Sequence, residues 1–404
     1  MKVLIINAVC GVGSTGRITS DMHDALIENG HECKIAFGLG AVHRVPASDT
    51  FKFNNWIGYY THNAVSRITD RAGFYSPIAT MRLIRMIREY DPDLIQLHNL
   101  HGYYLNVHML FDFLAAFDRP VVWTLHDCWP VTGHCAYFTM ANCDRWKTGC
   151  HHCVQTGSYP ASYVFDRSRK NWEQKKDLFT SVKSMTIVTP SQWLADIVSE
   201  SYLSAYPVQV IHNGIDLQTF KPSLSGFREK NGLQGKVIIL GVAIVWDYRK
   251  GLGDFVKLSK LLNDHYKIVL VGLNGEQLAS LPENILGISR TDSVAELAQI
   301  YTTADVFVNT TYEDNFPTVN IEALACGTPV ITYKTGGSPE AVDKTCGAVV
   351  ETGNISALYD AICSPELSSY DRPAIAEYAG AFSKEQKYRE YSNLYEELLS
   401  ERRR

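Results

Sequence analysis

The sequence predicts an α/β protein with two doubly wound, Rossmann-like domains. A chain of 404 residues is long enough for two such domains. Short apolar runs recur along it, and each ends in glycine or polar residues before a helical pattern, as buried parallel strands do. The stretch from Asn309 to Thr332 contains a strand end, a loop, a helix and a further strand. This is the βαβ unit from which doubly wound sheets are built.

Composition narrows the function classes. The chain is 46% hydrophobic and 20% charged, and its net charge of −5 argues against a general nucleic-acid binder. No apolar run approaches the roughly 18 residues that span a bilayer. Met1-Lys2 leads straight into an apolar strand pattern without a signal-peptide core. We therefore expect a cytoplasmic protein whose ten cysteines are mostly reduced.

The first predicted strand, residues 2–9, is followed by a glycine loop and a helix. Gly11, Gly13 and Gly16 match G-x-G-x-x-G, the pattern of dinucleotide sites. The second strand, Glu32 to Phe37, ends without an acid that could hold a ribose, which disfavours that interpretation. The same glycines let the backbone approach a phosphate or sugar. The alternative is a tight strand-to-helix turn.

Residues 52–90 are basic and aromatic. Six cations face two acids, a local charge of about +4 in an acidic protein, which suggests contact with membrane headgroups or a lipid diphosphate. The alternative is a pair of ordinary helices with Ile84 and Ile87 in the core. The residues concerned are Lys52, Arg67, Arg71, Arg82, Arg85 and Arg88, with Asp70 and Glu89, and Trp56, Tyr59, Tyr60, Phe74 and Tyr75 between them.

Two predicted strands, 94–97 and 120–125, end in histidine-containing loops. A histidine at the carboxyl end of a strand in this fold class points into the interdomain cleft. His126 is therefore the candidate catalytic residue of this half. His98 and His101 could contact an acceptor or could satisfy backbone groups of their loop.

Half of the cysteines fall within 26 residues, Cys128 to Cys153, interleaved with His134, His151 and His152. Four thiolates at this spacing can close a tetrahedral Zn²⁺ site, and a reducing compartment disfavours disulfides. The sequence thus predicts a structural zinc. The alternative is reduced cysteines packed as small apolar groups. The predicted ligands are Cys135, Cys143, Cys150 and Cys153.

The stretch from Asn309 to Thr332 combines an anion site with two acids. Pro317 suits the first turn of a helix over 319–326, whose free amides would face the carboxyl edge of the sheet. Asp314 and Glu322 flank these amides with seven residues between them. Glu322 could accept hydrogen bonds from a ribose diol. Asp314 could hold hydroxyls of a group attached to the phosphate.

This stretch resembles the Glu-x7-Glu loop of retaining glycosyltransferases of family 4. The alignment on Phe316 and on residues 322–329 places Asp314 at the first Glu and Glu322 at the second. Asp314 departs from the family pattern, and the adjacent Glu313 could substitute if the loop register shifts.

Other stretches follow the family's order. His212-Asn213-Gly214-Ile215-Asp216 resembles the hinge element after which the second domain begins. Lys250 matches the family's lysine, whereas Ile244 or Val245 occupies the usual arginine position, so Arg249 could compensate. The stretch 124–153 resembles an insertion in bacterial exopolysaccharide glycosyltransferases of the colanic-acid type.

The resemblance implies the GT-B fold, two doubly wound domains facing across a cleft. We expect an N-terminal domain over 1–207 with a Cys-rich insertion at 126–155, and a donor-binding domain over 208–382. A helix over 383–404 would cross back to the first domain.

The implied function is transfer of a hexose, with retention, from a UDP- or GDP-sugar to a glycan or lipid-linked glycan in bacterial surface polysaccharide synthesis. No catalytic metal is expected. The alternatives are a catalytically weak sugar-nucleotide-binding partner and a GT-B 2-epimerase. The resemblance implies catalytic roles for His126, Arg249, Lys250, Asp314 and Glu322, and donor contacts from Gly13, Gly16, Arg17, Asn213, Gly272, Arg290, Asn315, Phe316, Pro317, Thr318 and Glu322.

Overall fold

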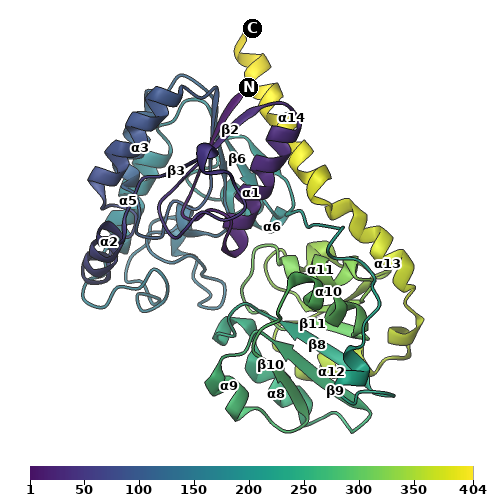
Figure 1. Cartoon of the computed structure of the whole chain (residues 1–404). Coiled ribbons are helices and arrows are strands. Elements are labelled where there is room, and N and C mark those ends of the chain that lie inside the picture. The colour runs from purple at the N-terminus through teal and green to yellow at the C-terminus, as the bar shows by residue number, and fades with distance from the viewer. Residues whose placement is uncertain (404) are drawn as a thin grey trace. The chain divides into compact units, whose positions relative to one another are not determined.

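The computed structural model describes residues 1–403 and divides the chain into two compact units. The first comprises Met1–His212 together with the C-terminal segment from Lys387, and the second comprises Asn213–Gln386. Each unit has a parallel sheet with helices packed on it (Figure 1). Among the helices in this range, none combines the length and hydrophobicity of a membrane span.

The first unit has a seven-stranded parallel sheet in the order β3-β2-β1-β4-β5-β6-β7. Its strands are β1 Lys2–Asn7, β2 Glu32–Phe37, β3 Thr50–Lys52, β4 Leu94–Leu97, β5 Val121–Thr124, β6 Met185–Thr189 and β7 Val208–Val210. Its helices are α1 Gly13–Glu28, α2 Trp56–Thr69, α3 Pro77–Tyr90, α4 Val107–Ala115, α5 Ser168–Phe179 and α6 Gln192–Ser199.

The second unit has a six-stranded parallel sheet in the order β10-β9-β8-β11-β12-β13. Its strands are β8 Val237–Val242, β9 Tyr266–Val271, β10 Ile285–Ile288, β11 Val306–Asn309, β12 Val330–Tyr333 and β13 Gly347–Val350. Its helices are α7 Phe227–Lys230, α8 Leu252–Ser259, α9 Gly275–Ser280, α10 Val294–Thr303, α11 Thr318–Ala325, α12 Ile355–Cys363 and α13 Arg372–Tyr378. The last described helix, α14 Lys384–Arg403, begins in this unit and belongs to the first unit from Lys387.

The two sheets confirm the predicted pair of doubly wound α/β folds. Their central strands contain continuous buried apolar runs, because helices cover both faces: Val3 to Ile6 of β1 and Ile238 to Leu240 of β8 are all 0% exposed. The prediction missed three strands. β3 is short and half-exposed, and β10 and β13 each contain a glycine that weakens the strand pattern.

Each sheet has one point at which the strand order reverses. In the first sheet it lies between β1 and β4, and in the second between β8 and β11. Loops leaving the carboxyl ends of two such neighbouring strands turn to opposite faces of the sheet and leave a crevice where ligands bind. The loops after these four strands are therefore where a functional site is expected.

Candidate active site

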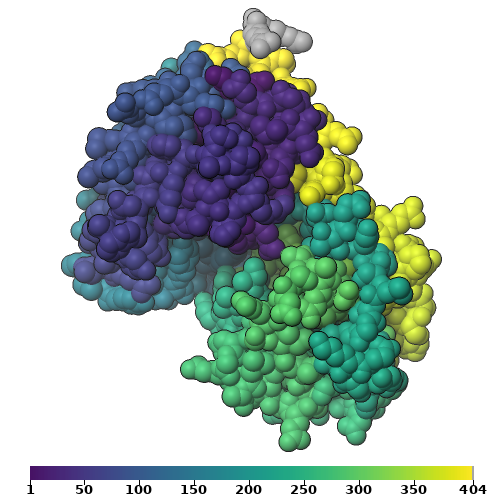
Figure 2. Space-filling view, viewed as in Figure 1, coloured from purple at the N-terminus to yellow at the C-terminus, as the bar shows by residue number. Residues whose placement is uncertain are grey.

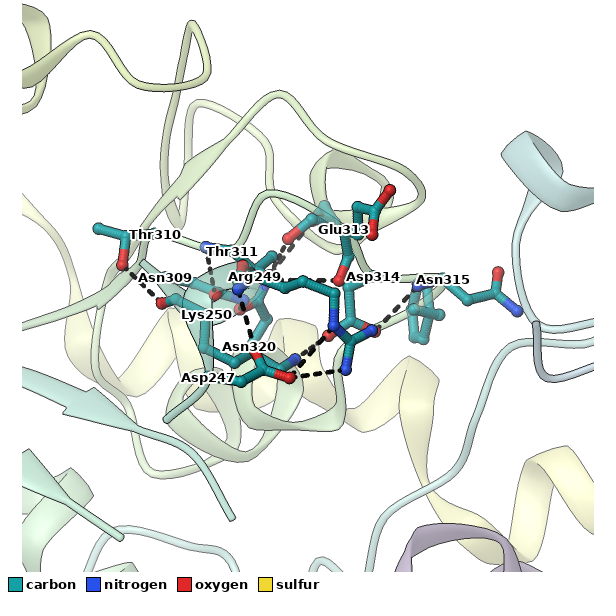
Figure 3. A network of polar contacts seen from close by, with 12 residues as sticks. Asp247, Arg249, Lys250, Asn309, Thr310, Thr311, Glu313, Asp314, Asn315 and Asn320 are labelled. Carbon is teal, nitrogen blue, oxygen red and sulfur yellow. Dashed lines mark hydrogen bonds and ion pairs between the residues drawn. The ribbon is translucent and has the colours of Figure 1, made fainter. Parts of the chain in front are cut away.

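In the second unit, the loops that follow β8 and β11 are locked together (Figure 3). Lys250 Nζ donates to Asp314 Oδ2 at 2.5 Å, and the Tyr312 amide donates to the Arg249 carbonyl at 2.6 Å. The Thr310 hydroxyl adds a bond to the Lys250 carbonyl at 3.0 Å. The predicted Lys250 and Asp314 therefore meet directly at the switch point, although 64 residues separate them in sequence.

Arg249 is held by a neighbour that the sequence reading did not single out. Asp247 accepts from the Arg249 guanidinium at 3.0 Å and 3.2 Å, and its other oxygen accepts from the Arg249 amide at 3.0 Å. Both side chains are about one-third exposed. The pair fixes one cation at the mouth of β8, where an anionic ligand can still reach it (Figure 3).

Asp314 and Glu313 occupy different environments. The Asp314 carboxylate pairs with Lys250 at a partly exposed position, whereas Glu313 is only 2% exposed. In Figure 3 the Glu313 side chain points away from Lys250. The loop register in this structure thus presents Asp314 to the lysine.

Helix α11 places Glu322 one turn inside the helix and 8% exposed. The Tyr301 hydroxyl of α10 donates to Glu322 Oε2 at 3.0 Å. Burial, followed by the neighbouring carboxylate, raises the pKa of Tyr301 well above its usual value, so the phenol stays a donor. One carboxylate oxygen is thereby fixed in orientation by a residue with no sequence signal of its role.

The start of α11 differs slightly from the prediction. Pro317 is the N-cap and Thr318 the first helical residue, whereas Pro317 was expected within the first turn. Proline offers no side-chain acceptor to the amides of that turn, so they can serve an anion instead. Asn213 at the start of the unit supports this loop, since its side-chain amide donates to the Phe316 carbonyl at 3.2 Å.

Gly336, in the loop after β12, packs closely against the loop that contains Asp314, which we call the acid loop. Gly336 has φ +54°, and a Cβ built on it would lie 1.8 Å from the Asp314 carbonyl oxygen. Any side chain there would push the acid loop away. Gly251, with φ +71° and a Cβ position 2.3 Å from the Thr310 carbonyl oxygen, does the same on the β8 side.

The remaining predicted residues of this unit follow other strands of the sheet. Gly272 follows β9 with φ +99°, and a Cβ there would meet the Ala243 carbonyl oxygen at 1.7 Å. Arg290 lies in the loop after β10 and is exposed. Asn315 precedes Phe316 and is buried, with its amide bonded to the Asp314 carboxylate at 2.9 Å. All are at the carboxyl edge of the sheet, but no direct contact joins Arg290 to the Lys250–Asp314 pair among the described interactions.

In the first unit, histidines follow β4 and β5. His98 Nδ1 and His126 Nε2 are 2.9 Å apart with their rings stacked, so one of the two nitrogens donates to the other. Burial lowers the pKa of His126 to about 4 and that of His98 well below its usual value. Both rings are therefore neutral near pH 7. The buried Nε2 of His98 has no hydrogen-bond partner within residues 1–403.

A second polar pair stands beside the first. His101 Nε2 is 2.7 Å from Asp127 Oδ2, and its Nδ1 is 3.0 Å from the Tyr159 hydroxyl. Burial alone would raise the pKa of Asp127, but His101 and a bond from the Trp129 amide lower it overall. Asp127 is thus an anion that orients His101. Tyr159 was not anticipated, because it lies 58 residues from His101 in sequence.

The glycine loop follows β1 at the same carboxyl edge. Gly13 is the first residue of α1 with φ +65°, and Gly16 is buried against Val9. The Arg17 side chain is exposed and bonds back to the Gly13 carbonyl at 3.3 Å. The loop places backbone and one cation at the switch point of the first sheet, without contact to the histidine pair among the described hydrogen bonds.

The cysteine segment does not bear out the predicted zinc site. Its four cysteines line one small cavity together with Phe138 and Trp146. However, no group of three or more His, Cys, Asp or Glu side chains in the described part of the chain has metal-ligating geometry. A hydrogen bond joins the Cys135 and Cys153 thiols, and Cys150 Sγ accepts from the Gly133 amide at 3.2 Å. Cys135, Cys143, Cys150 and Cys153 are free cysteines in this structure.

Comparison with known proteins matches both halves of the chain. The family described as "Glycosyltransferase Family 4" matches residues 15–219, and the family described as "Glycosyl transferases group 1" matches residues 235–364. WcaC of Escherichia coli (strain K12), a glycosyl transferase named for colanic acid biosynthesis, is 25% identical over 98% of this chain and 100% of its own.

Solved structures share the fold. Sucrose-phosphate synthase from Thermosynechococcus elongatus has a TM-score of 0.70 at 17% identity and covers 99% of both chains. HepE from Anabaena, solved with UDP, has a TM-score of 0.68 at 18% identity and covers 98% of this chain and 100% of its own. HepE has also been solved with UDP-glucose. The two parallel sheets and these neighbours confirm the GT-B fold class.

Proposed function

Because this chain belongs to glycosyltransferase family 4, we propose that it moves a hexose from a nucleotide diphosphate sugar to a glycan or lipid-linked glycan, with retention at the anomeric carbon. The pathway we propose is bacterial surface polysaccharide synthesis, in the cytoplasm. The observation that carries the proposal is the locked pair of loops at the β8/β11 switch point. These loops bring two cations, two acids and a helix N-terminus without a side-chain cap to one edge of the sheet.

The cations and helix amides suit a diphosphate leaving group. As the bond from the anomeric carbon to the phosphate oxygen breaks, negative charge grows on that oxygen. Arg249, Lys250 and the first-turn amides of α11 can stabilise this charge from fixed positions. In the proposed front-face reaction, the acceptor oxygen bonds to the anomeric carbon as the phosphate leaves. The acceptor's hydroxyl proton passes to the departing phosphate oxygen.

The two acids suit two different sets of hydroxyl groups. Tyr301 fixes one oxygen of Glu322, which leaves the carboxylate oriented to accept from a ribose diol. Asp314 holds Lys250 and would accept from hydroxyls of the transferred sugar. UDP-glucose is a reasonable first donor to test, because the similar HepE has been solved with it.

The first unit would serve the acceptor and the transferred sugar. His126 is neutral and stacked on His98, so it can donate or accept one hydrogen bond without adding charge. We propose that His126 lies beside the transferred sugar, as the resemblance to family 4 implies.

A thermal-shift screen of UDP- and GDP-sugars tests the donor. A ligand present at 100 times its Kd should stabilise the protein by about 2.7 kcal/mol. Glu322→Gln should abolish the shift, whereas the matched control Glu351→Gln, an exposed acid of the same unit paired only with exposed Lys334, should keep it. A full shift in Glu322→Gln would remove Glu322 from the site.

Product analysis tests the reaction. NMR of the product glycan should show the same anomeric configuration as the donor, and an inverted product contradicts the proposed mechanism. Conversion of the donor without any acceptor would indicate a 2-epimerase. Donor binding without turnover against any acceptor pool would indicate a binding partner.

A further inference from the structure

Helix α2 presents apolar residues to solvent and polar residues to the protein. Its fully buried positions are His62 and Ser66. Trp56, Ile57 and Tyr60 are 71%, 56% and 63% exposed, and Ile68 at the other end is 50% exposed. The usual pattern of a surface helix is the reverse, with the apolar stripe facing the core.

The buried face of α2 is satisfied by its polar groups. His62 Nδ1 is 2.8 Å from the Ser76 hydroxyl, and His62 Nε2 accepts from the Gly73 amide at 3.2 Å. Burial lowers the pKa of His62 to about 3, so the ring is neutral, as its accepting Nε2 requires. The buried polar face therefore anchors the helix, while Trp56, Ile57 and Ile68 stay exposed and Tyr60 meets the Tyr59 ring edge-on.

A loop extends the apolar surface beside the end of α2. The Tyr163 amide donates to the Arg67 carbonyl at 2.7 Å, and the Phe165 amide donates to the Ile68 carbonyl at 3.2 Å. Tyr163, Val164 and Phe165 are 67%, 63% and 51% exposed. We call the exposed side chains of Trp56, Ile57, Tyr60, Ile68, Tyr163, Val164 and Phe165 the outer α2 face.

Exposed cations lie on α2 itself and on the next helix, α3. Arg67 lies within it, 3.1 Å from the Tyr163 hydroxyl and over its ring. The neighbouring α3 adds exposed Arg82, Arg85 and Arg88 against one exposed acid, Glu89. Four arginines less one glutamate give +3 on helices α2 and α3, in a chain whose net charge is −5. Both helices lie at the outer side of their unit (Figure 1), and that side is open surface in Figure 2.

We propose that the outer α2 face docks the protein onto an anionic lipid bilayer. Trp and Tyr with aliphatic neighbours suit the headgroup boundary, and arginines suit anionic headgroups. From Trp56 to Ile68 the stripe is about 18 Å long, at 1.5 Å per residue. A helix of this kind lies in the plane of the interface and does not cross it. This inference goes beyond sugar transfer and does not depend on which sugar is moved.

The chemistry favours lipid over a protein partner. The apolar side chains are exposed along one face of α2, and the net charge of helices α2 and α3 is positive. A bilayer of opposite charge complements both features at once. A second copy of the chain would instead bring a like charge of +3 against this one, which opposes self-association.

Co-sedimentation with vesicles tests the proposal on the full chain. We expect binding to phosphatidylcholine vesicles that contain phosphatidylglycerol, and weak binding to phosphatidylcholine alone. Trp56→Ser combined with Tyr60→Ser should lower the partition coefficient at least about tenfold, because two interfacial aromatic anchors are lost. The matched control is Leu224→Ser, which removes the most exposed apolar side chain of the second unit, at 97% exposure. It should leave partitioning unchanged.

A double charge-reversal variant distinguishes electrostatic binding to lipid from nonspecific apolar binding. Arg82→Glu with Arg88→Glu should reduce binding to the anionic vesicles by about tenfold or more, since each basic residue near the surface contributes about 1 kcal/mol. Lys260→Glu, an exposed lysine of the second unit, is the control. Raising the salt concentration should weaken binding by the wild-type chain more than binding by the arginine variant.

Three results would overturn the proposal. The first is no sedimentation with anionic vesicles at low salt, and the second is undiminished binding by the Trp56 and Tyr60 double variant. The third is a dimer in light scattering that this variant abolishes, which would make the face a contact between copies. Unchanged Tm and unchanged donor-induced thermal shift in each variant would show that its fold and donor site are intact.

Discussion

The loops at the two switch points are alike in topology and opposite in electrostatics. After β8 and β11 the side chains are ionic and partly exposed, with Lys250 on Asp314 and Arg249 on Asp247. After β4, at the switch point of the first sheet, and after its neighbour β5, the side chains are mostly buried histidines, and burial keeps His98 and His126 uncharged. The same crevice geometry therefore supports two kinds of recognition.

The difference fits two kinds of ligand. Partly exposed ion pairs can exchange one anion for another at modest cost, which suits a diphosphate that arrives and leaves. Neutral histidines in a desolvated site suit hydroxyl groups, which carry no charge and need directed hydrogen bonds. Under the proposed function, charge would hold the donor in the second unit and hydrogen bonds would hold the acceptor in the first.

Among the changes considered, removal of Lys250 should have the largest effect on activity. Lys250→Ala deletes a cation that would stabilise the leaving diphosphate, and it leaves Asp314 unpaired and repelling that diphosphate. We expect kcat to fall about 100- to 1,000-fold, or roughly 3–4 kcal/mol, in a steady-state transfer assay. Lys257→Ala, which removes an exposed lysine from an ion pair on the neighbouring α8, is the control. Comparable losses in the two variants would mean that Lys250 acts only on stability.

The next prediction concerns the close backbone packing of Gly336 against the acid loop. Gly336→Ala would place a methyl carbon 1.8 Å from the Asp314 carbonyl oxygen and would strain a backbone with φ +54°. We expect a loss of about 3 kcal/mol in the free energy of unfolding, or loss of donor binding if the loop moves instead. Urea denaturation and the thermal-shift assay distinguish these outcomes. Gly253→Ala, in a helix with open space around the new methyl, should be neutral or stabilising.

Much of the placement of the proposed donor site could be predicted, because its residues are close in sequence to strand ends. Lys250, Asp314 and Glu322 stand in patterned stretches, and the order of strands and helices places those stretches at one sheet edge. The partners that fix them were not predictable in the same way. Tyr301 reaches Glu322 from another helix, and nothing local marks it. Asp247 was within reach of inspection, since it lies two residues before Arg249.

In the cysteine segment, the sequence predicts a zinc site that the described part of the structure does not show. The spacing of its four cysteines fits a zinc knuckle, and they do gather around one cavity. Spacing sets which residues can approach, but the directions of the sulfur atoms depend on packing with Phe138, Trp146 and the Gly133 backbone. Sequence alone does not contain those directions.

For the histidines of the first unit, the prediction concerns how the free energy of unfolding depends on pH. The pKa of His126 is about 4 in the folded chain, below the ordinary value of 6.5, so the unfolded chain binds the proton more readily. Its contribution to stability is complete above pH 6.5 and is lost as the pH falls toward 4. Allowing for solvent at the partly exposed ring, we expect about 2 kcal/mol over this range.

Urea denaturation at several pH values measures that slope. His126→Asn should flatten it, because the replacement does not titrate. His108→Asn, an exposed histidine on α4, is the control and should leave the slope unchanged. An unaltered slope in His126→Asn would show that the ring titrates normally and that this site is more hydrated than its burial indicates.

The smallest expected effect tests whether the second unit's ion pairs are exchangeable. Asp247→Ala frees Arg249 from three hydrogen bonds but leaves its charge in place. If the donor diphosphate competes with Asp247 for Arg249, removing Asp247 should lower the KM for donor. The decrease should be no more than about fivefold, or roughly 1 kcal/mol, and it should be smaller at high salt. A much larger rise in KM would mean that Asp247 positions Arg249 rigidly. Arg249 would then be held in one orientation, as the histidines of the first unit are. The two sites would differ in charge and not in rigidity.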